Sequence, residues 1–390
     1  MKRISADLML TPTGKLVPGH QLTFDDRGTI HYFGPIKEDV DEHVTGTISP
    51  GFINTHCHLE LSHLENRIPQ KKGLHGFISD FLQARKNYPS PDFDAIKNAD
   101  RSMWQNGIMA VADICNTSDS FIVKKESKIV YHSFIELFDI RKTATDEAYT
   151  NGLRLYDNAR ASHLEASLTP HAPYSVSDEL FSRIAAHKNA NDTLWSLHNQ
   201  ESSAENELFE NHEGKLYELM QKAGVDFYGD IPFPTESIQR SFRFFPANGN
   251  ILLVHNTFIR EKDLQFLFSK NLKNRLWFCL CPLANLYIED RIPDIALLRN
   301  NGAQITIGTD SLASNHQLSV LAELKAIAGL YPEINAGELL QWATSNGAGF
   351  MNFPKLGNFS EGNTPGILWL PQITDFQKTI PQTTTITRMA

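Results

Sequence analysis

The stretch that decides the fold is Ser49-Pro50-Gly51-Phe52-Ile53-Asn54-Thr55-His56-Cys57-His58. A Pro-Gly turn leads into a short apolar run that ends in two histidines spaced two residues apart. Because alternate residues of a strand point to the same face, both imidazoles can face one axis and share a metal ion. On its own the pair would equally fit two polar histidines at a strand end that bind no metal. Other candidate ligands in the chain are needed to distinguish these two interpretations.

Apolar runs alternate with longer amphipathic segments downstream of this stretch, which is the pattern of βα units around a parallel sheet. Eight runs are predicted to be strands, the number that a closed barrel needs: 51–55, 108–113, 129–136, 166–169, 194–197, 251–254, 276–280 and 304–307. Helices are predicted at 76–87, 178–189, 207–223, 261–270 and 318–328, and 88–100, with two prolines, as a loop leading into a helix. The predicted fold class is α/β, a (β/α)8 TIM barrel.

Both ends of the chain carry shorter β-prone pieces. Runs at 6–10, 21–24 and 29–33 are separated by turn-forming clusters, and short β-like pieces return beyond residue 353. We therefore expect a small β-sandwich formed by both termini, residues 1–50 and 356–390, beside a barrel of residues 51–355.

Composition narrows the class of protein. The 390 residues are 41% hydrophobic, enough for a sizeable core, and the net charge of -9 disfavours a nucleic-acid partner. We expect no signal peptide and no membrane span. Four irregularly spaced cysteines do not make a disulfide framework, and Cys279 and Cys281, which could be imagined as metal ligands, are interpreted as small buried hydrophobes. We expect a cytoplasmic protein with a small-molecule substrate that can assemble into a homo-oligomer.

Residues of the types that bind metals follow three more predicted strands. His198 follows the fifth strand, His255 the sixth and Asp310 the eighth, and active sites of such barrels lie at the carboxyl ends of the strands. Imidazoles with one carboxylate suit zinc or ferrous iron and leave a position for water. We predict one divalent metal, zinc before iron, with His255 as an alternative ligand to the main set of His56, His58, His198 and Asp310.

Together these motifs resemble the amidohydrolase superfamily, in which the first strand ends in His-x-His and the last in a metal-binding Asp. Binuclear members usually carry a Lys on the fourth strand, but residues 165–175 contain none. The segments His171-Ala172-Pro173-Tyr174-Ser175 and His198-Asn199-Gln200-Glu201 look like the mononuclear branch that deaminates adenosine-type molecules, such as S-adenosylhomocysteine and methylthioadenosine. The run His58-Leu59-Glu60-Leu61-Ser62 is similar to that of aminodeoxyfutalosine deaminases of menaquinone biosynthesis.

The resemblance implies a role for each site residue. Glu201 would protonate the purine ring nitrogen and help ammonia leave, and His255 would stabilise the developing charge. Asp310 would bind the metal and accept a proton from water. Substrate contacts are expected from Glu60 (to ribose hydroxyls), His171 and Asn285, and a cation for a substrate carboxylate from Arg67, Lys71 or Lys72.

Other functions use the same residues. Metal and water could also cleave another carbon–nitrogen bond or a carbon–chlorine bond, as in an amide or triazine hydrolase. Related nucleoside deaminases often have a polar or basic pair where Leu283-Ala284 stands, so a contact near the seventh strand can differ. A non-catalytic scaffold would have lost ligands, whereas all are present. The prediction is a metal-dependent deaminase of an adenosine-type nucleoside.

Overall fold

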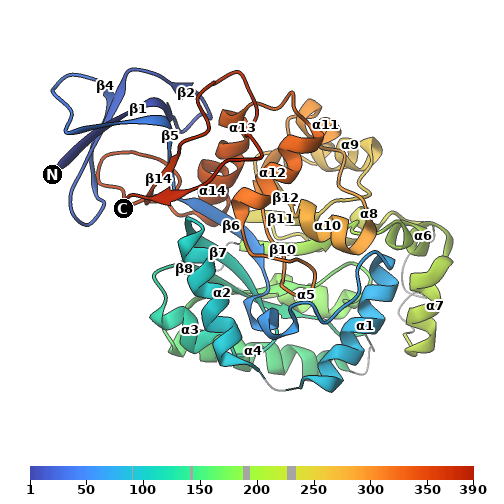
Figure 1. Ribbon diagram of the computed structural model, residues 1–390. Helices are drawn as coiled ribbons and strands as arrows, with labels where there is room; N and C mark the ends of the chain where they lie inside the picture. Colours follow the sequence, from blue (N-terminus) through green and yellow to red (C-terminus); the bar gives the residue numbers. More distant parts are fainter. Residues whose placement is uncertain (90, 141–143, 188–193, 226–233) are drawn as a thin grey trace.

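The computed structural model of the protein describes residues 1–89, 91–140, 144–187, 194–225 and 234–390 (Figure 1). Its central strands coincide with the eight predicted ones. They form two four-stranded parallel sheets, the first made of β6 (Phe52–Cys57), β7 (Ile108–Cys115), β8 (Val130–Leu137) and β9 (Glu165–Pro170), and the second of β10 (Leu194–Asn199), β11 (Asn250–His255), β12 (Leu276–Leu280) and β13 (Gln304–Ile307). The α/β class with parallel sheets is confirmed, but the ladder is not continuous around a closed barrel.

The two sheets approach each other at both of their free edges. Between β9 and β10, the backbone N–H of His198 donates to the carbonyl of His171 at 2.9 Å. Between β13 and β6, the N–H of Asp310 donates to the carbonyl of His56 at 3.1 Å. Residues predicted for the active site therefore lie at the two seams between the sheets.

Helices alternate with these strands and cover them on the outside (Figure 1). They are α1 (Gly73–Asn87), α2 (Phe93–Gln105), α3 (Phe121–Glu126), α4 (Thr145–Ala161), α5 (Asp178–Ala186), α6 (Ser203–Asn211), α7 (Gly214–Lys222), α8 (Ser237–Phe242), α9 (Glu261–Ser269), α10 (Pro282–Glu289), α11 (Ile295–Asn300), α12 (Val320–Leu330), α13 (Ala336–Gln341) and α14 (Gly347–Met351), with short helical segments η1 (Leu59–Leu64) and η4 (Trp342–Asn346). No helix in the described parts of the chain is long and apolar enough to cross a membrane.

Two predicted helical boundaries differ from the structure. The predicted helix 207–223 is two helices, because His212 (φ 53°) ends α6 and Gly214 (φ 89°) begins α7, both in conformations with positive φ that interrupt the helix. The predicted loop 88–100 already contains the start of α2, where the Asp92 carboxylate caps the helix by accepting from the N–H of Ala95 at 3.0 Å. The last two residues of the predicted helix 178–189 lie outside the described residues.

Both chain ends share a seven-stranded sheet, in the order β15-β14-β5-β1-β3-β4 with β2 paired to β1. Its strands are β1 (Lys2–Leu10), β2 (Leu16–Val17), β3 (His20–Phe24), β4 (Ile30–Pro35), β5 (Glu42–Pro50), β14 (Ile367–Leu370) and β15 (Thr387–Arg388). Figure 1 shows the N- and C-terminal strands together at one end of the molecule. The C-terminal segment thus rejoins the N-terminal unit as predicted, but as part of one sheet, and a two-sheet sandwich is not confirmed.

Central strands are buried along nearly their whole length, which explains their apolar runs. Neighbouring residues of β6 belong to different clusters. Phe52 belongs to the cluster that includes Ile108 and helix residues such as Leu264, whereas Ile53 belongs to the cluster that includes Ala110 and Val254. This packing fixes the strands rigidly, so their carboxyl ends can hold side chains in a defined geometry.

Candidate metal centre and active-site cavity

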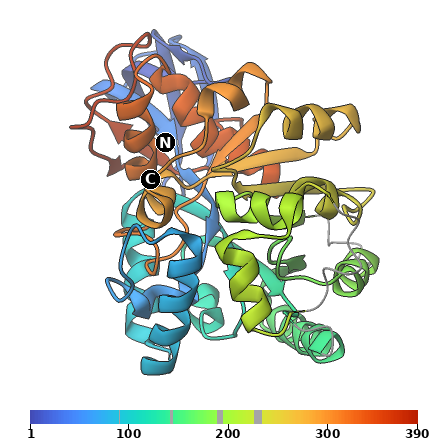
Figure 2. The ribbon, with the colours of Figure 1, turned by 90° about the vertical axis from the view of Figure 1, so that its right-hand side faces the viewer.

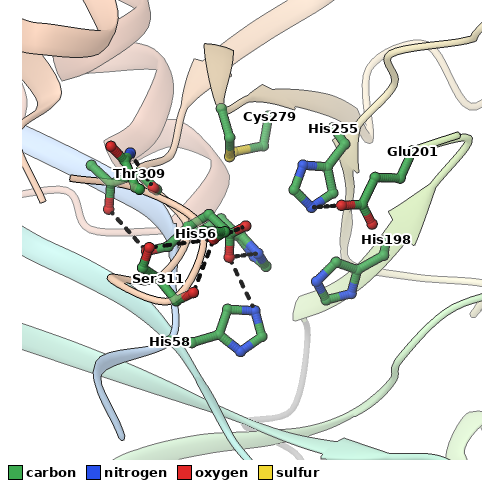
Figure 3. Close-up of polar contacts among 12 residues, drawn as sticks. His56, His58, His198, Glu201, His255, Cys279, Thr309 and Ser311 are labelled. Atoms are coloured by element: carbon green, nitrogen blue, oxygen red, sulfur yellow. Dashed lines mark hydrogen bonds and ion pairs between the residues drawn. The ribbon is translucent and has the colours of Figure 1, made fainter. Parts of the chain in front are cut away.

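Three histidines from different sheets face a common space (Figure 3). His56 lies on β6, His58 follows it, and His198 lies on β10. Ring centroids are 4.9 Å apart for His56–His58, 4.9 Å for His56–His198 and 5.6 Å for His58–His198. One nitrogen of each ring lies within 4.8 Å of the corresponding nitrogens of the other two. The structure brings the three predicted histidine ligands together.

Asp310, the fourth predicted ligand, reaches the same cluster. Its Oδ1 lies 3.7 Å from Nε2 of His56 and 3.6 Å from Nε2 of His58. Its Oδ2 accepts a hydrogen bond from the Ser314 hydroxyl at 2.7 Å. The backbone of Asp310 is left-handed (φ 57°), a conformation that Asp tolerates better than most residues. The Ser314 contact holds one carboxylate oxygen and leaves the other directed at the histidines.

This donor set fits a divalent transition metal. Both ring nitrogens of His56 are buried without a hydrogen-bond partner among the described residues, which is costly unless a further group binds there. Burial lowers the pKa of His58 and of His198 to about 4 and holds the pKa of His56 well below its ordinary value. The imidazoles are therefore neutral near pH 7 and offer lone pairs, as metal binding requires.

His198 is oriented by its surroundings. Its Nδ1 lies 3.0 Å from the backbone carbonyl of His171, which can only accept, so Nδ1 carries the hydrogen and Nε2 keeps the lone pair. Oε1 of Glu136, at the end of β8, lies 3.4 Å from the same Nδ1. Oε2 of Glu136 accepts from the side-chain amide of Asn116 at 3.1 Å. Sequence reasoning missed Glu136, although a carboxylate at a predicted strand end was the signal that could have found it.

Glu201 and His255 form a second polar pair beside the histidine cluster. Nε2 of His255 lies 3.7 Å from Oε1 of Glu201, and both side chains are buried (Figure 3). Burial raises the pKa of Glu201 well above its ordinary value and lowers the pKa of His255. The surroundings thus favour a protonated carboxyl next to a neutral imidazole, the state in which a carboxyl can donate a proton.

A cavity of about 210 Å³ opens beside these residues. Part of its lining is polar and consists of site residues, among them His58, His198, Glu201, His255 and Asp310. The rest of the lining is mostly apolar and comes from α1, α7 and α10 and from the segments after β8 and β9. Figure 2 looks onto the face of the molecule where α1 and α7 lie.

Of the three predicted substrate contacts, His171 lines this cavity and the other two do not. Asn285 lies behind His255 and donates from Nδ2 to its Nδ1 at 3.2 Å. Glu60 accepts from the backbone N–H of Asn116 at 3.1 Å. Asn285 and Glu60 are therefore placed to support residues that do line the cavity.

The three cations predicted to meet a substrate carboxylate are also absent from the cavity lining. Lys71 pairs with Asp290 at 2.8 Å and Lys72 with Asp80 at 2.9 Å, and the guanidinium of Arg67 lies 4.5 Å from the Tyr88 ring centre. The sequence could not show this, because which loop side chains turn toward the cavity depends on tertiary packing.

The two cysteines near the end of the seventh central strand, β12, do not line the cavity. Cys279 and Cys281 are buried free thiols, and their Sγ atoms lie 3.9 Å apart. Their burial agrees with the prediction that they are small buried hydrophobes. Leu283 and Ala284 lie in the first turn of α10, and the N–H of Leu283 donates to Oε2 of Glu323 at 2.8 Å. Neither Leu283 nor Ala284 lines the cavity.

Several known proteins are similar to this chain. A 5′-deoxyadenosine deaminase of Methanococcus maripaludis is 24% identical over 348 residues, which cover 84% of this chain and 76% of the relative. An aminodeoxyfutalosine deaminase of Nitratiruptor sp. is 24% identical over 325 residues, which cover 80% of this chain and 76% of the relative.

Solved structures share the fold. The aminofutalosine deaminase of Helicobacter pylori in complex with methylthio-coformycin matches with a TM-score of 0.78 and 23% identity over 94% of this chain and 91% of that one. The zinc complex of an atrazine chlorohydrolase from Arthrobacter aurescens matches with a TM-score of 0.72 and 18% identity over 94% and 86%. A model of the amidohydrolase family matches residues 47–388. The chain belongs to the amidohydrolase family, and it is a hydrolase of carbon–nitrogen bonds other than peptide bonds.

Proposed function

We propose that the protein is a metal-dependent deaminase that hydrolyses an adenosine-type nucleoside to the inosine-type product and ammonia. The observation that carries the proposal is the buried carboxyl of Glu201, which lies 3.7 Å from His255 and lines the same cavity as the candidate ligands His58, His198 and Asp310. Deamination of a purine needs a proton donor beside activated water, and this pair supplies the donor. The names of the relatives support the same reaction.

The proposed ligands are His56, His58, His198 and Asp310, holding one divalent metal with zinc expected before iron. When bound, the metal supplies a Lewis acid that lowers the pKa of a water molecule. The carbonyl of His171 and the hydroxyl of Ser314 would keep two of these ligands in the required orientation.

Three residues that line the cavity have separate catalytic roles in the proposed reaction. Glu201 gives its proton to the ring nitrogen next to the amine-bearing carbon, and the carboxylate that results accepts the hydroxyl proton of the adduct as ammonia leaves. His255 donates a hydrogen bond from Nε2 to the attacking oxygen. The Asp310 carboxylate accepts the proton that the attacking water loses and returns it to the departing amine group.

Three other polar residues that line the cavity would bind the sugar. His171, Asn116 and Glu136 line the cavity next to the ligands and would meet the ribose. Glu60, predicted as the ribose contact, would act at one remove by holding the backbone of Asn116. Oε1 of Glu136 has no hydrogen-bond partner among the described residues and could form a hydrogen bond with a ribose hydroxyl.

The architecture suits this chemistry. We propose that the two sheets work as one (β/α)8 barrel over residues 51–355, with 1–50 and 356–390 as an accessory unit. The hydrogen bonds at both seams, His198 to His171 and Asp310 to His56, support this reading. Action in the cytoplasm without a nucleic-acid partner, and assembly into a homo-oligomer, stay predictions.

A substrate screen tests the function. Zinc-loaded protein is incubated with adenosine, 5′-deoxyadenosine, methylthioadenosine, S-adenosylhomocysteine and aminodeoxyfutalosine, and ammonia release is followed with the absorbance change from adenine to hypoxanthine. We expect at least one nucleoside to be deaminated. If none reacts while an amino- or chloro-substituted triazine is hydrolysed, the nucleoside proposal is wrong.

A further inference from the structure

One face of α1 forms a wall of the cavity that the proposed chemistry leaves unused. Leu74, Phe77, Ile78, Phe81, Leu82 and Arg85 all line the cavity. They follow the spacing of a single helix face, three or four residues apart. Five apolar side chains therefore lead along the helix to one guanidinium at its C-terminal end.

The walls facing α1 are apolar as well. Phe138 and Ile140 follow β8, Met220 lies on α7 and Ile288 on α10, and all four line the cavity. On α1 the rings of Phe77 and Phe81 are stacked with centroids 6.1 Å apart. An aromatic group fits such a lining better than a polar chain, because apolar and aromatic surface is removed from water without leaving hydrogen bonds unmade.

Arg85 is the one Lys or Arg among the described residues that line the cavity. Its guanidinium lies 5.9 Å from the ring centre of Phe81. It is exposed, and it makes no ion pair with a carboxylate in the parts of the chain that the structure describes. A partner for this cation can therefore come from the substrate.

The carboxylates that line the cavity lie beside the histidine cluster. Each of them is close to a histidine of the polar cluster: Glu136 Oε1 is 3.4 Å from His198, Glu201 Oε1 is 3.7 Å from His255, and Asp310 Oδ1 is 3.6 Å from His58. None of these three carboxylates forms an ion pair with Arg85, so the apolar residues of α1 lead to a positive charge that the described lining does not neutralise.

We propose that Arg85 selects nucleosides whose 5′ substituent has an apolar, aromatic body that ends in a carboxylate. This inference rests on the proposed function. The purine amine has to lie at the proposed metal ligands, and the 5′ substituent then extends along the apolar face of α1 toward Arg85. A 5′ substituent that ends in an amino acid would leave its ammonium group without a partner beside Arg85. A neutral substituent would contact the apolar face of α1 but would form no ion pair with Arg85.

The test compares two variants on matched substrates. Arg85→Gln removes the charge, and Lys86→Gln is the control, because Lys86 is the neighbouring exposed cation and does not line the cavity. The substrates are 5′-deoxyadenosine, a 5′-aryl derivative, and the same aryl derivative with a terminal carboxylate. Equilibrium binding of the corresponding inosine-type products repeats the comparison without turnover.

In the unaltered protein the carboxylated nucleoside should have the highest kcat/KM. Arg85→Gln should lower that value about ten-fold, mainly through KM, because one charge-assisted contact is lost at an exposed site. The two uncharged nucleosides should change by less than about two-fold, and Lys86→Gln should leave all three unchanged. Added salt should weaken binding of the carboxylated substrate more than binding of the two uncharged substrates.

Two results would overturn the inference. One is equal kcat/KM for the charged and uncharged aryl nucleosides, and the other is an equal loss for both in Arg85→Gln. In either case deamination of 5′-deoxyadenosine would still uphold the proposed function. If none of the three is deaminated, the proposed function fails and the inference falls with it.

Discussion

The side-chain amide of Asn285 donates to Nδ1 of His255 across 3.2 Å, and this contact decides which imidazole nitrogen faces the cavity. Because the amide nitrogen can only donate, Nδ1 accepts and Nε2 carries the hydrogen. Nε2 is the atom that lies 3.7 Å from Glu201. Asn285 also donates to the hydroxyl of Thr257 at 2.8 Å, which is consistent with this orientation of the amide.

Replacing Asn285 separates positioning from substrate contact. Asn285→Leu should lower kcat about ten-fold or more through loss of the correct His255 tautomer, with KM and metal content nearly unchanged. Steady-state kinetics with metal analysis checks this. A raised KM at unchanged kcat would instead mean that Asn285 touches the substrate, as the sequence alone had suggested.

Glu201→Gln tests proton transfer. The amide keeps the shape of the side chain but cannot deliver the proton, so turnover should fall about 10²-fold or more while the bound metal is retained. Glu207→Gln, an exposed carboxylate on α6, is the control and should keep full activity. Loss of metal with a preserved rate per bound metal would assign Glu201 to the ligand set.

Gly308 tests how tightly the core holds His56. A methyl group at this position would lie 2.7 Å from Sγ of Cys279 and 2.8 Å from Cβ of His56. Gly308→Ala should cost about 1–3 kcal/mol of stability and reduce metal content, as seen in thermal unfolding and metal analysis. Gly329→Ala, whose nearest contact is Nε2 of Gln382 at 3.4 Å, should lower neither, because Ala is compatible with this position in helix α12. Equal behaviour of the two variants would show that the packing around His56 yields easily.

His132 should make stability depend on pH. Burial lowers its pKa from 6.5 to about 3, helped by the charges of Lys124 and Arg160. The unfolded chain therefore binds a proton that the folded protein excludes, so stability present above pH 6.5 is lost as the pH falls toward 3. The Tm of the protein should fall more steeply over this range than the Tm of His132→Gln. Parallel curves would mean that His132 is not the cause.

Much of the site could be predicted from the sequence, because its residues follow apolar strands whose carboxyl ends meet. His56, His58, His198 and Asp310 were found in this way, and the structure places them in one cluster. The same rule applied to the third strand would have found Glu136.

Arg85 could not be predicted from the sequence. It lies on a helix far from any strand end, and its place at the cavity depends on how α1 packs against α7 and α10. Strand β5 was missed for a related reason, because its first residues are exposed and polar and its pairing with β1 and β14 is long-range. The break between α6 and α7 required backbone conformations at His212 and Gly214 that residue types only suggest.

The most direct test of the central claim is a zinc titration of metal-stripped protein, with ammonia release from an adenosine-type nucleoside as the readout. The account predicts no release without metal, a rise with added zinc, and a plateau at about one zinc per chain. His56→Ala should give neither tight zinc binding nor release. Full turnover by metal-free protein would contradict the account.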